Sequence, residues 1–162
     1  MINAAKLSLQ GGSGVDEAIH AAAGPKLHDE CSQLGNCAVG DAKITKAYDL
    51  PCERVIHTVG PIYSVDDAEQ AAGHLRSAYQ QSLELADRNE MYSISFPAIS
   101  TGIHGYPIEE AAKVALEAIR DYLEGDRPRE TLTRVIICNF SEQAMEIYQR
   151  AIPKYFPDAY QS

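Results

Sequence analysis

The pattern of apolar and polar positions predicts several helices along the chain. Between residues 68 and 86, apolar side chains recur every three or four positions and form one stripe, which indicates a helix with one buried face. Pro107 suits the first position of another such helix, and Ser141 is a suitable N-cap. Helices are therefore predicted over residues 68–86 and 108–123, from Ser141 to about Tyr155, and from near Val15 to Gly24.

Short β-branched and apolar runs between these helices predict strands. Three of the runs are continuous, as in buried strands, and one alternates polar with apolar residues, as in a half-exposed strand. The alternation of strands and helices indicates an α/β sandwich with a largely parallel sheet, which binds ligands at the carboxyl ends of its strands. One strand is predicted to begin at Ile2, and four others are predicted over residues 41–48, 54–60, 91–99 and 133–140.

Two glycine-containing loops follow predicted strands at that edge of the sheet. Residues 10–16 read QGGSGVD and residues 100–107 read STGIHGYP, and each loop leads into a helix. Glycines let the backbone approach a ligand closely, and helix N-termini favour anions. Two such loops on one edge suggest a diphosphate site, although ordinary strand–helix turns also use glycines.

Composition and charge narrow the class of partner. A length of 162 residues suits one domain, and the 14 basic and 23 acidic residues give a net charge of −9. This charge argues against nucleic acid as the main partner, because nucleic-acid binders present a basic face. It does not exclude a small anion bound by backbone N–H groups. The absence of an apolar run near 18 residues argues against a membrane span.

The cysteines and the N-terminus bear on location and on metals. No pair among the four cysteines has C-x-x-C spacing, and no secretory signal is visible. An intracellular location, cytoplasmic or nuclear, is therefore expected. His28 and Cys31 have the spacing to share a metal on one helix, but a surface histidine and a half-buried cysteine explain them more simply. We expect no metal site.

The order of the motifs INAA, GGSGVDEAIHAAAG, IHTVGP and FPAISTGIHGYP resembles the macrodomain family, and most closely its MacroD-type branch. This resemblance covers nearly the whole chain. It implies a three-layer α/β/α sandwich with a mixed, largely parallel central sheet that binds ADP-ribose. MacroD-type members remove mono-ADP-ribose from acidic side chains of proteins and hydrolyse O-acetyl-ADP-ribose. The resemblance implies no metal and no nucleotide cofactor, and it leaves the oligomeric state open.

The resemblance assigns roles to individual residues. Asp16 matches the catalytic aspartate, Asn3 lies near the distal ribose, and His20 stands one helical turn behind Asp16. A carboxylate at a helix start can orient an attacking water. Phe140 lies where an aromatic residue stacks on adenine. The remaining ligand-binding positions, next to INAA and in the two loops, are Ile2, Gly11, Gly12, Ser13, Gly14, Val15, Ser100, Thr101, Gly102, Ile103, His104 and Gly105.

Simpler structural roles stand beside these assignments. In the absence of the family resemblance, Asp16 would be interpreted as an acidic residue at a helix N-terminus that complements the helix dipole. His20 is better explained as a support behind the site than as an acid or base. His57 lies inside an apolar strand and is expected to be a structural histidine with satisfied hydrogen bonds. Phe140 also suits a core position at the end of a strand.

Lys6 is the main departure from the family pattern. The family pattern has an asparagine at this position, and the asparagine side chain is uncharged and both donates and accepts hydrogen bonds. Lysine instead has three donors, no acceptor and a positive charge. Pairing with Asp16 would weaken that carboxylate as a base. Alternatively, Lys6 contacts phosphate or points to solvent. We predict slower hydrolysis than in other MacroD-type enzymes, with ADP-ribose binding retained.

Two further substitutions fall in the loops. His104 stands where the family pattern has Phe or Tyr against the distal ribose. Its planar imidazole can still pack there, and it can also bond a phosphate or a ribose hydroxyl. Ser13 replaces a glycine and either adds a hydroxyl contact or narrows the loop.

The family normally has two strands before INAA, in a segment whose aspartate contacts adenine. The expectation is therefore a single macrodomain over residues 1–162 that lacks this N-terminal segment. The usual adenine anchor then has no counterpart. Lys6 in place of the asparagine, together with this missing segment, favours the alternative function, a non-catalytic ADP-ribose reader.

Overall fold

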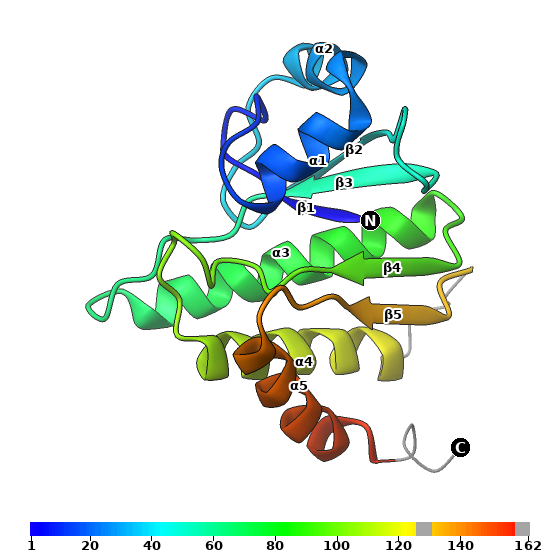
Figure 1. Cartoon of the computed structure of the whole chain (residues 1–162). Helices are drawn as coiled ribbons and strands as arrows, with labels where there is room; N and C mark the ends of the chain where they lie inside the picture. The colour runs from blue at the N-terminus through cyan, green and yellow to red at the C-terminus, as the bar shows by residue number, and fades with distance from the viewer. Residues whose placement is uncertain (126–130, 158–162) are drawn as a thin grey trace.

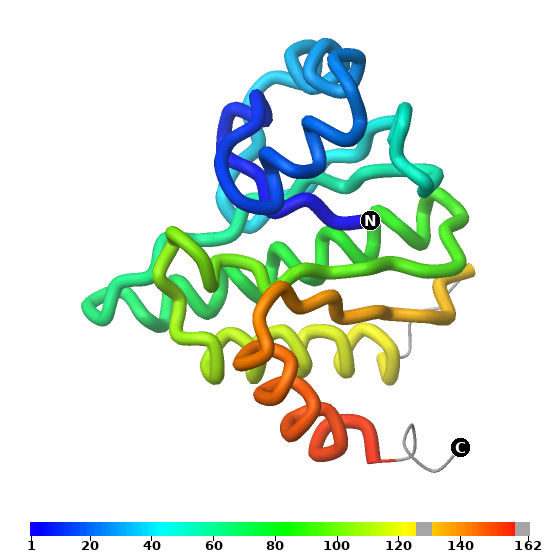
Figure 2. Tube along the Cα trace, in the orientation of Figure 1, coloured from blue at the N-terminus to red at the C-terminus, as the bar shows by residue number. Residues whose placement is uncertain are grey.

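The computed structural model describes residues 1–125 and 131–157, in which five strands form the central layer. Within two hydrogen-bonded sheets, β1 pairs parallel with β3, β3 pairs antiparallel with β2, and β4 pairs parallel with β5. Figures 1 and 2 place β1 between β3 and β4, so the order across the layer is β2-β3-β1-β4-β5. The strands are β1 (Ile2–Ala4), β2 (Ala42–Lys46), β3 (Arg54–Thr58), β4 (Ser93–Phe96) and β5 (Arg134–Ile137).

Helices cover both faces of this layer (Figure 1), which confirms the three-layer α/β/α sandwich. α1 packs on β1 and α2 on β2, whereas α3 packs on β2, β3 and β4, α4 on α3, and α5 on α4. None of the helices in the described part of the chain has the length and apolar character of a membrane span. The helices are α1 (Val15–Ala23), α2 (Pro25–Leu34), α3 (Ala68–Arg88), α4 (Ile108–Glu124) and α5 (Glu142–Tyr155).

The sheet separates two hydrophobic cores. Because successive strand residues point to opposite faces, Val55 and Ile56 of β3 enter different cores. The α1–α2 core includes the fully buried Leu9, Leu27, Cys31 and Val55. The α3–α5 core includes Ile56, Leu75, Tyr79, Phe96 and Tyr148.

Local sequence signals explain where several helices begin and end. Gly24 ends α1 with φ = +79°, a conformation that glycine adopts without strain. Ser141 Oγ accepts a hydrogen bond from Ala144 N at 3.2 Å, so the predicted cap of α5 is confirmed. Pro107 was predicted at the first helical position, but it occupies the N-cap, and α4 begins one residue later, at Ile108.

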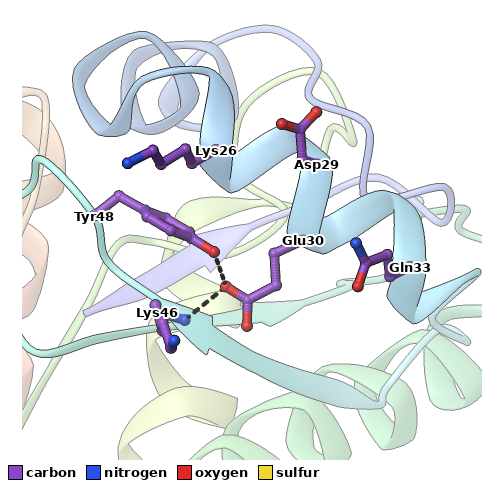
Figure 3. A pocket seen from close by; sticks show the side chains of 6 residues that line it. All are labelled: Lys26, Asp29, Glu30, Gln33, Lys46 and Tyr48. Carbon is purple, nitrogen blue, oxygen red and sulfur yellow. Dashed lines mark hydrogen bonds between the residues drawn. The ribbon is translucent and has the colours of Figure 1, made fainter.

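A carboxylate of α2 fixes this helix above β2 (Figure 3). Glu30 Oε2 accepts hydrogen bonds from Tyr48 Oη at 2.7 Å and from Lys46 N at 3.1 Å. Tyr48 has φ = +52°, an uncommon conformation for a bulky residue, and its hydroxyl reaches back to α2. The position of α2 matters for the site because Cys31 on the same helix packs behind β3.

Candidate functional site

A cavity of about 330 Å³ lies between the two predicted ligand loops. Both loops leave the carboxyl ends of strands: residues 5–14 follow β1, and residues 97–107 follow β4. The cavity therefore occupies the edge of the sheet that the sequence predicted. Its lining consists of Ala4, Ala5, Lys6, Ser13, Gly14, Val15, Asp16, Gly60, Pro97, Ala98, Ile99, Ser100, Gly102, Ile103 and His104.

Asp16 is a buried carboxylate at the second position of α1. Its side chain is 2% exposed, and Oδ1 accepts a hydrogen bond from Asn3 Nδ2 at 2.8 Å. His20 Nε2 lies 3.5 Å from the same oxygen, as the spacing of four residues predicted. Oδ2 has no hydrogen-bond partner among the described residues. Asp16 is thus held through one oxygen, while the other is free to bind a water or a ligand.

Asn3 is the second buried polar residue of this cluster. It lies in β1 with its side chain fully buried, directly opposite His57 in the parallel pairing with β3. Its Nδ2 contacts both Asp16 Oδ1 and His57 Nδ1, the latter at 3.1 Å. Its Oδ1 has no hydrogen-bond partner among the residues that the structure describes. A buried orphan acceptor is costly, so a ligand donor would be favoured at this position.

Lys6 and Asp16 converge over Gly12. A methyl group added at Gly12 would lie 2.6 Å from Lys6 Cε and 3.0 Å from Asp16 Oδ2. Lys6 is exposed and lines the cavity, and within the described chain it forms no ion pair with Asp16. The lysine stem therefore covers the first loop, with its charge close to Asp16 but not paired with it.

Among the described residues, no side chain caps the N-terminus of α1. The N-cap is Gly14, with φ = +65°, and Val15 at the first helical position lines the cavity. The first N–H groups of a helix have no intrahelical acceptor and carry partial positive charge. The start of α1 thus has backbone donors that could bind an anion, and binding of an anion by the first loop stays a prediction.

Ser100 is a strained residue in the second loop. It is not glycine, yet it has φ = +66°, and its buried Oγ has no hydrogen-bond partner within the described residues. Its carbonyl accepts a hydrogen bond from Tyr106 N at 3.0 Å, and Thr101 Oγ1 donates to Ala98 O at 2.8 Å. Strain of this kind persists where the surrounding structure imposes it, often at ligand sites.

His104 ties the second loop to the segment after β3. Its Nδ1 donates a hydrogen bond to Pro61 O at 3.1 Å, and its carbonyl accepts one from Tyr63 N at 2.9 Å. Because Nδ1 is used in this way, Nε2 is the ring nitrogen left for a ligand. Ile103 beside it is 80% exposed and forms an apolar rim of the cavity.

Several predicted site residues do not line the cavity. Ile2 is buried in the α3–α5 core, and Asn3 and His20 lie behind Asp16. Phe140, after β5, is fully exposed, which shows that it is not a core residue, and its stacking on adenine stays a prediction. Also outside the lining are Gly11, Gly12, Thr101 and Gly105.

Some lining residues were not predicted as site residues. Gly60 was interpreted as the end of a strand, and Pro97, Ala98 and Ile99 as part of one. A Cβ at Gly60 would lie 2.5 Å from Ile99 Cγ2 and closer still to Ser100 Oγ. The Gly-Pro pair after a strand was the available signal, since a glycine there also permits a close approach of two backbones.

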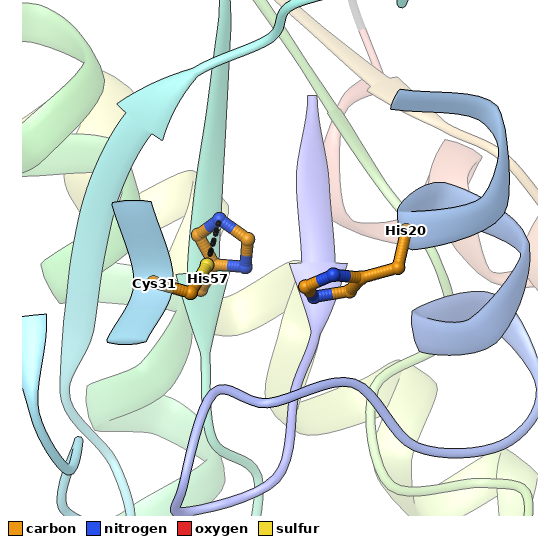
Figure 4. Close-up of side chains that lie close together, drawn as sticks. All are labelled: His20, Cys31 and His57. Carbon is orange, nitrogen blue, oxygen red and sulfur yellow. Dashed lines mark hydrogen bonds between the residues drawn. The ribbon is translucent and has the colours of Figure 1, made fainter. Parts of the chain in front are cut away.

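Among the described residues, the only cluster of metal-ligating side chains is His20, Cys31 and His57 (Figure 4); His28, whose spacing to Cys31 was set aside as a metal pair, is not part of it. Burial raises the pKa of the Cys31 thiol to about 11 and lowers the pKa of His57 to about 4. Both groups are therefore neutral near pH 7, and His57 Nε2 lies 2.9 Å from Thr45 Oγ1. A metal would have to displace that hydrogen bond and deprotonate the thiol, so the cluster fits a metal poorly.

Comparisons with known proteins agree with this architecture. A family profile described as Macro domain matches residues 2–115. The ADP-ribose glycohydrolase MACROD1 of Bos taurus is 50% identical over 159 residues, which are 98% of this chain and 48% of that protein. The chain therefore spans about half the length of this relative.

Two further proteins match over most of their own length. The O-acetyl-ADP-ribose deacetylase of Klebsiella pneumoniae is 47% identical over 96% of this chain and 89% of that protein. The solved structure of the Oceanobacillus iheyensis macrodomain with ADP has a TM-score of 0.87 at 39% identity, covering 98% of this chain and 84% of that one.

Proposed function

The chain belongs to the Macro domain family as a MacroD-type member, and we propose that it is a hydrolase that binds ADP-ribose in the cavity between its two loops. Its substrates would be proteins that carry mono-ADP-ribose on acidic side chains, and O-acetyl-ADP-ribose. We take residues 1–162 as a single macrodomain. The observation that carries the proposal is the buried Asn3–Asp16 pair, in which Asp16 lines the cavity and each residue keeps one acceptor that has no hydrogen-bond partner among the described residues.

The proposed pose follows from the donors and the free acceptors. The diphosphate would lie between the uncapped start of α1 and the loop from Ser100 to Gly105, where backbone N–H groups favour an anion. The distal ribose would then lie near Asp16, Asn3 and Lys6. The adenine would extend toward Phe140, whose fully exposed ring is available for stacking.

Asp16 would act on water. In an acidic-residue ester, the scissile bond joins the anomeric carbon of the distal ribose to a carboxyl oxygen. Water supplies the new oxygen, and the products are ADP-ribose and the free carboxylic acid. The free Oδ2 of Asp16 can orient that water and accept its proton, while Asn3 holds the carboxylate through Oδ1, with His20 Nε2 3.5 Å from the same oxygen.

A non-catalytic reader of ADP-ribose is the second candidate. The observation that favours it is Lys6, whose stem lies over Gly12 next to Asp16. A positive charge there would strengthen binding of an anionic ligand and would weaken Asp16 as a base. In either case the four free cysteines suit action inside the cell, in the cytoplasm or nucleus.

The deciding experiment is single-turnover release of ADP-ribose from an automodified acidic-residue substrate. We expect release by the wild type and its loss in Asp16→Ala, with ADP-ribose affinity measured on both. Glu17→Ala is the matched control, because it removes an exposed carboxylate from the same helical turn. Binding without release by the wild type would identify a reader, and the absence of both would refute the proposed function.

A further inference from the structure

We propose that His57, held in place by Thr45, is a positioning residue that orients the side-chain amide of Asn3 toward the reaction site. The inference deepens the proposed function and rests on it, because it assumes that Asn3 acts beside Asp16. Asn3 and His57 are paired neighbours in β1 and β3, and Thr45 reaches His57 from β2. Three adjacent strands thus contribute one residue each to a buried polar chain.

The directions of these hydrogen bonds follow from chemistry. The Asn3 amide nitrogen can only donate, so His57 Nδ1 at 3.1 Å must accept and carries no proton. The single proton of the neutral imidazole is therefore on Nε2, which lies 2.9 Å from Thr45 Oγ1. The threonine oxygen accepts this bond, and its own hydroxyl proton points toward Val55 O at 3.5 Å.

His57 remains neutral because burial, and to a smaller extent the nearby His20 and the N-terminus, lowers its pKa. Its side chain is fully buried between Cys31, whose Sγ is 3.7 Å from Nε2, and His20, whose ring centroid is 6.1 Å away (Figure 4). A protonated ring would place a second donor against Asn3 Nδ2 and would break the contact. The acceptor at Nδ1 is thus present whenever His57 is neutral.

The consequence for Asn3 is a single orientation of its amide. Both Nδ2 protons have acceptors, Asp16 Oδ1 and His57 Nδ1, so the amide cannot rotate without losing two buried hydrogen bonds. In the opposite orientation, Asn3 Oδ1 would face the carboxylate oxygen of Asp16. The observed orientation leaves Asn3 Oδ1 without a partner among the described residues, directly behind the Asp16 carboxylate that lines the cavity, where a ligand donor that reaches past Asp16 would be favoured.

The first test changes Thr45 and leaves every residue near the ligand intact. Thr45→Val keeps the shape of the side chain but removes the acceptor for His57 Nε2. We expect the single-turnover rate to fall by about 10-fold or more, as for other losses of orientation. Affinity for ADP, which lacks the distal ribose, should stay unchanged. Thr45→Ser restores the hydroxyl and should return the rate to within about twofold of the wild type.

Thr58→Val is the matched control. It removes a buried threonine hydroxyl from β3, one residue after His57, but this hydroxyl donates to Asp41 O at 2.9 Å and not to the chain behind Asn3. We expect a near wild-type rate for this variant. Equal losses in Thr45→Val and Thr58→Val would mean that only general stability had changed, and would overturn the proposal.

Nitrogen NMR of the histidine rings tests the same chain without any activity. We expect the wild type to show His57 with a protonated Nε2 and an unprotonated Nδ1, and Thr45→Val to lose this pure state and to shift the Asn3 side-chain amide resonances. If the wild type carries the proton on Nδ1, the proposal is wrong whatever the rates are. If the wild type shows the expected protonation state but releases no ADP-ribose, the proposed function and the role of His57 in catalysis are both refuted. Only the hydrogen-bonded chain from Thr45 to Asn3 would then be supported.

Discussion

Gly60 lies directly beneath Ser100, so close that no larger residue fits between the end of β3 and the second loop. A Cβ at residue 60 would approach Ile99 Cγ2 to 2.5 Å and would meet Ser100 Oγ. Ser100 already has an uncommon backbone conformation and therefore has little freedom to move. The contact couples the chain after β3 to the wall of the cavity.

We therefore predict that Gly60→Ala displaces the second loop and weakens ADP-ribose binding by about 10-fold or more, with a lower melting temperature. Calorimetric titration and thermal unfolding would measure the two effects. Gly73→Ala is the control, because a Cβ there meets nothing within 4 Å and lies inside α3. That variant should gain up to about 1 kcal/mol of stability and bind ADP-ribose normally. Equal binding by Gly60→Ala and the wild type would contradict the prediction.

Lys6→Asn should raise the turnover of ADP-ribose release several-fold. The substitution removes a positive charge next to Asp16 and restores an uncharged donor and acceptor at the first loop. Single-turnover release would be compared with that of Lys113→Asn, which makes the same change of charge on α4. ADP-ribose should still bind both variants, with affinity unchanged in Lys113→Asn and modestly lower in Lys6→Asn, because that variant loses a positive charge near the anionic ligand. An unchanged or lower rate in Lys6→Asn would show that the lysine does not restrain the reaction.

The stability of the protein should decrease as the pH falls from 6.5 toward 4. Burial, and to a smaller extent the proximity of His20 and of the N-terminus, lowers the pKa of His57 to about 4 from its ordinary value of 6.5. In this pH window the unfolded chain binds a proton that the folded chain does not bind. The free energy of unfolding therefore decreases as the pH decreases. The total loss from this one group is roughly 3 kcal/mol.

Urea unfolding at a series of pH values would measure this loss. His57→Gln should be less stable near neutral pH but should show a shallower decline. His28→Gln, which changes an exposed histidine on α2, should keep the slope of the wild type. Parallel slopes for the wild type and His57→Gln would mean that His57 is not the group responsible.

Ser141→Ala should lower the free energy of unfolding by about 1 kcal/mol, because Ala144 N then loses the acceptor that caps α5. Ser141→Asp should retain most of the stability, since aspartate also caps and its charge suits a helix N-terminus. Denaturant unfolding of the three proteins would test both statements. Equal stability of Ser141→Ala and the wild type would show that the cap is replaced by solvent.

Most elements of the fold were predictable because their signals are local. The apolar stripe between residues 68 and 86 became α3 (Ala68–Arg88), and the alternating stretch at 41–48 contains β2 (Ala42–Lys46). The order of the strands and the antiparallel direction of β2 were not predictable from periodicity. These features depend on which strands pair across the layer, and a side-chain pattern specifies only the face that each strand buries.

The same limit applies to the candidate site. Both loops were expected at one edge of the sheet, and the structure brings them together around the cavity. His57 was predicted to be a structural histidine with satisfied hydrogen bonds, but its partners could not be predicted. Its position opposite Asn3 depends on the register between β1 and β3. The individual ligand contacts assigned to the loops, and the stacking role of Phe140, remain predictions.

The position of the cavity between the two cores has a consequence for the whole fold. The first loop is anchored by Leu9 in the α1–α2 core, and the second by Ile99 and Tyr106 in the α3–α5 core. A ligand held by both loops would act as a non-covalent crosslink between these halves. Its free energy of binding would then add to the cost of separating the two cores as well as to the cost of unfolding either one.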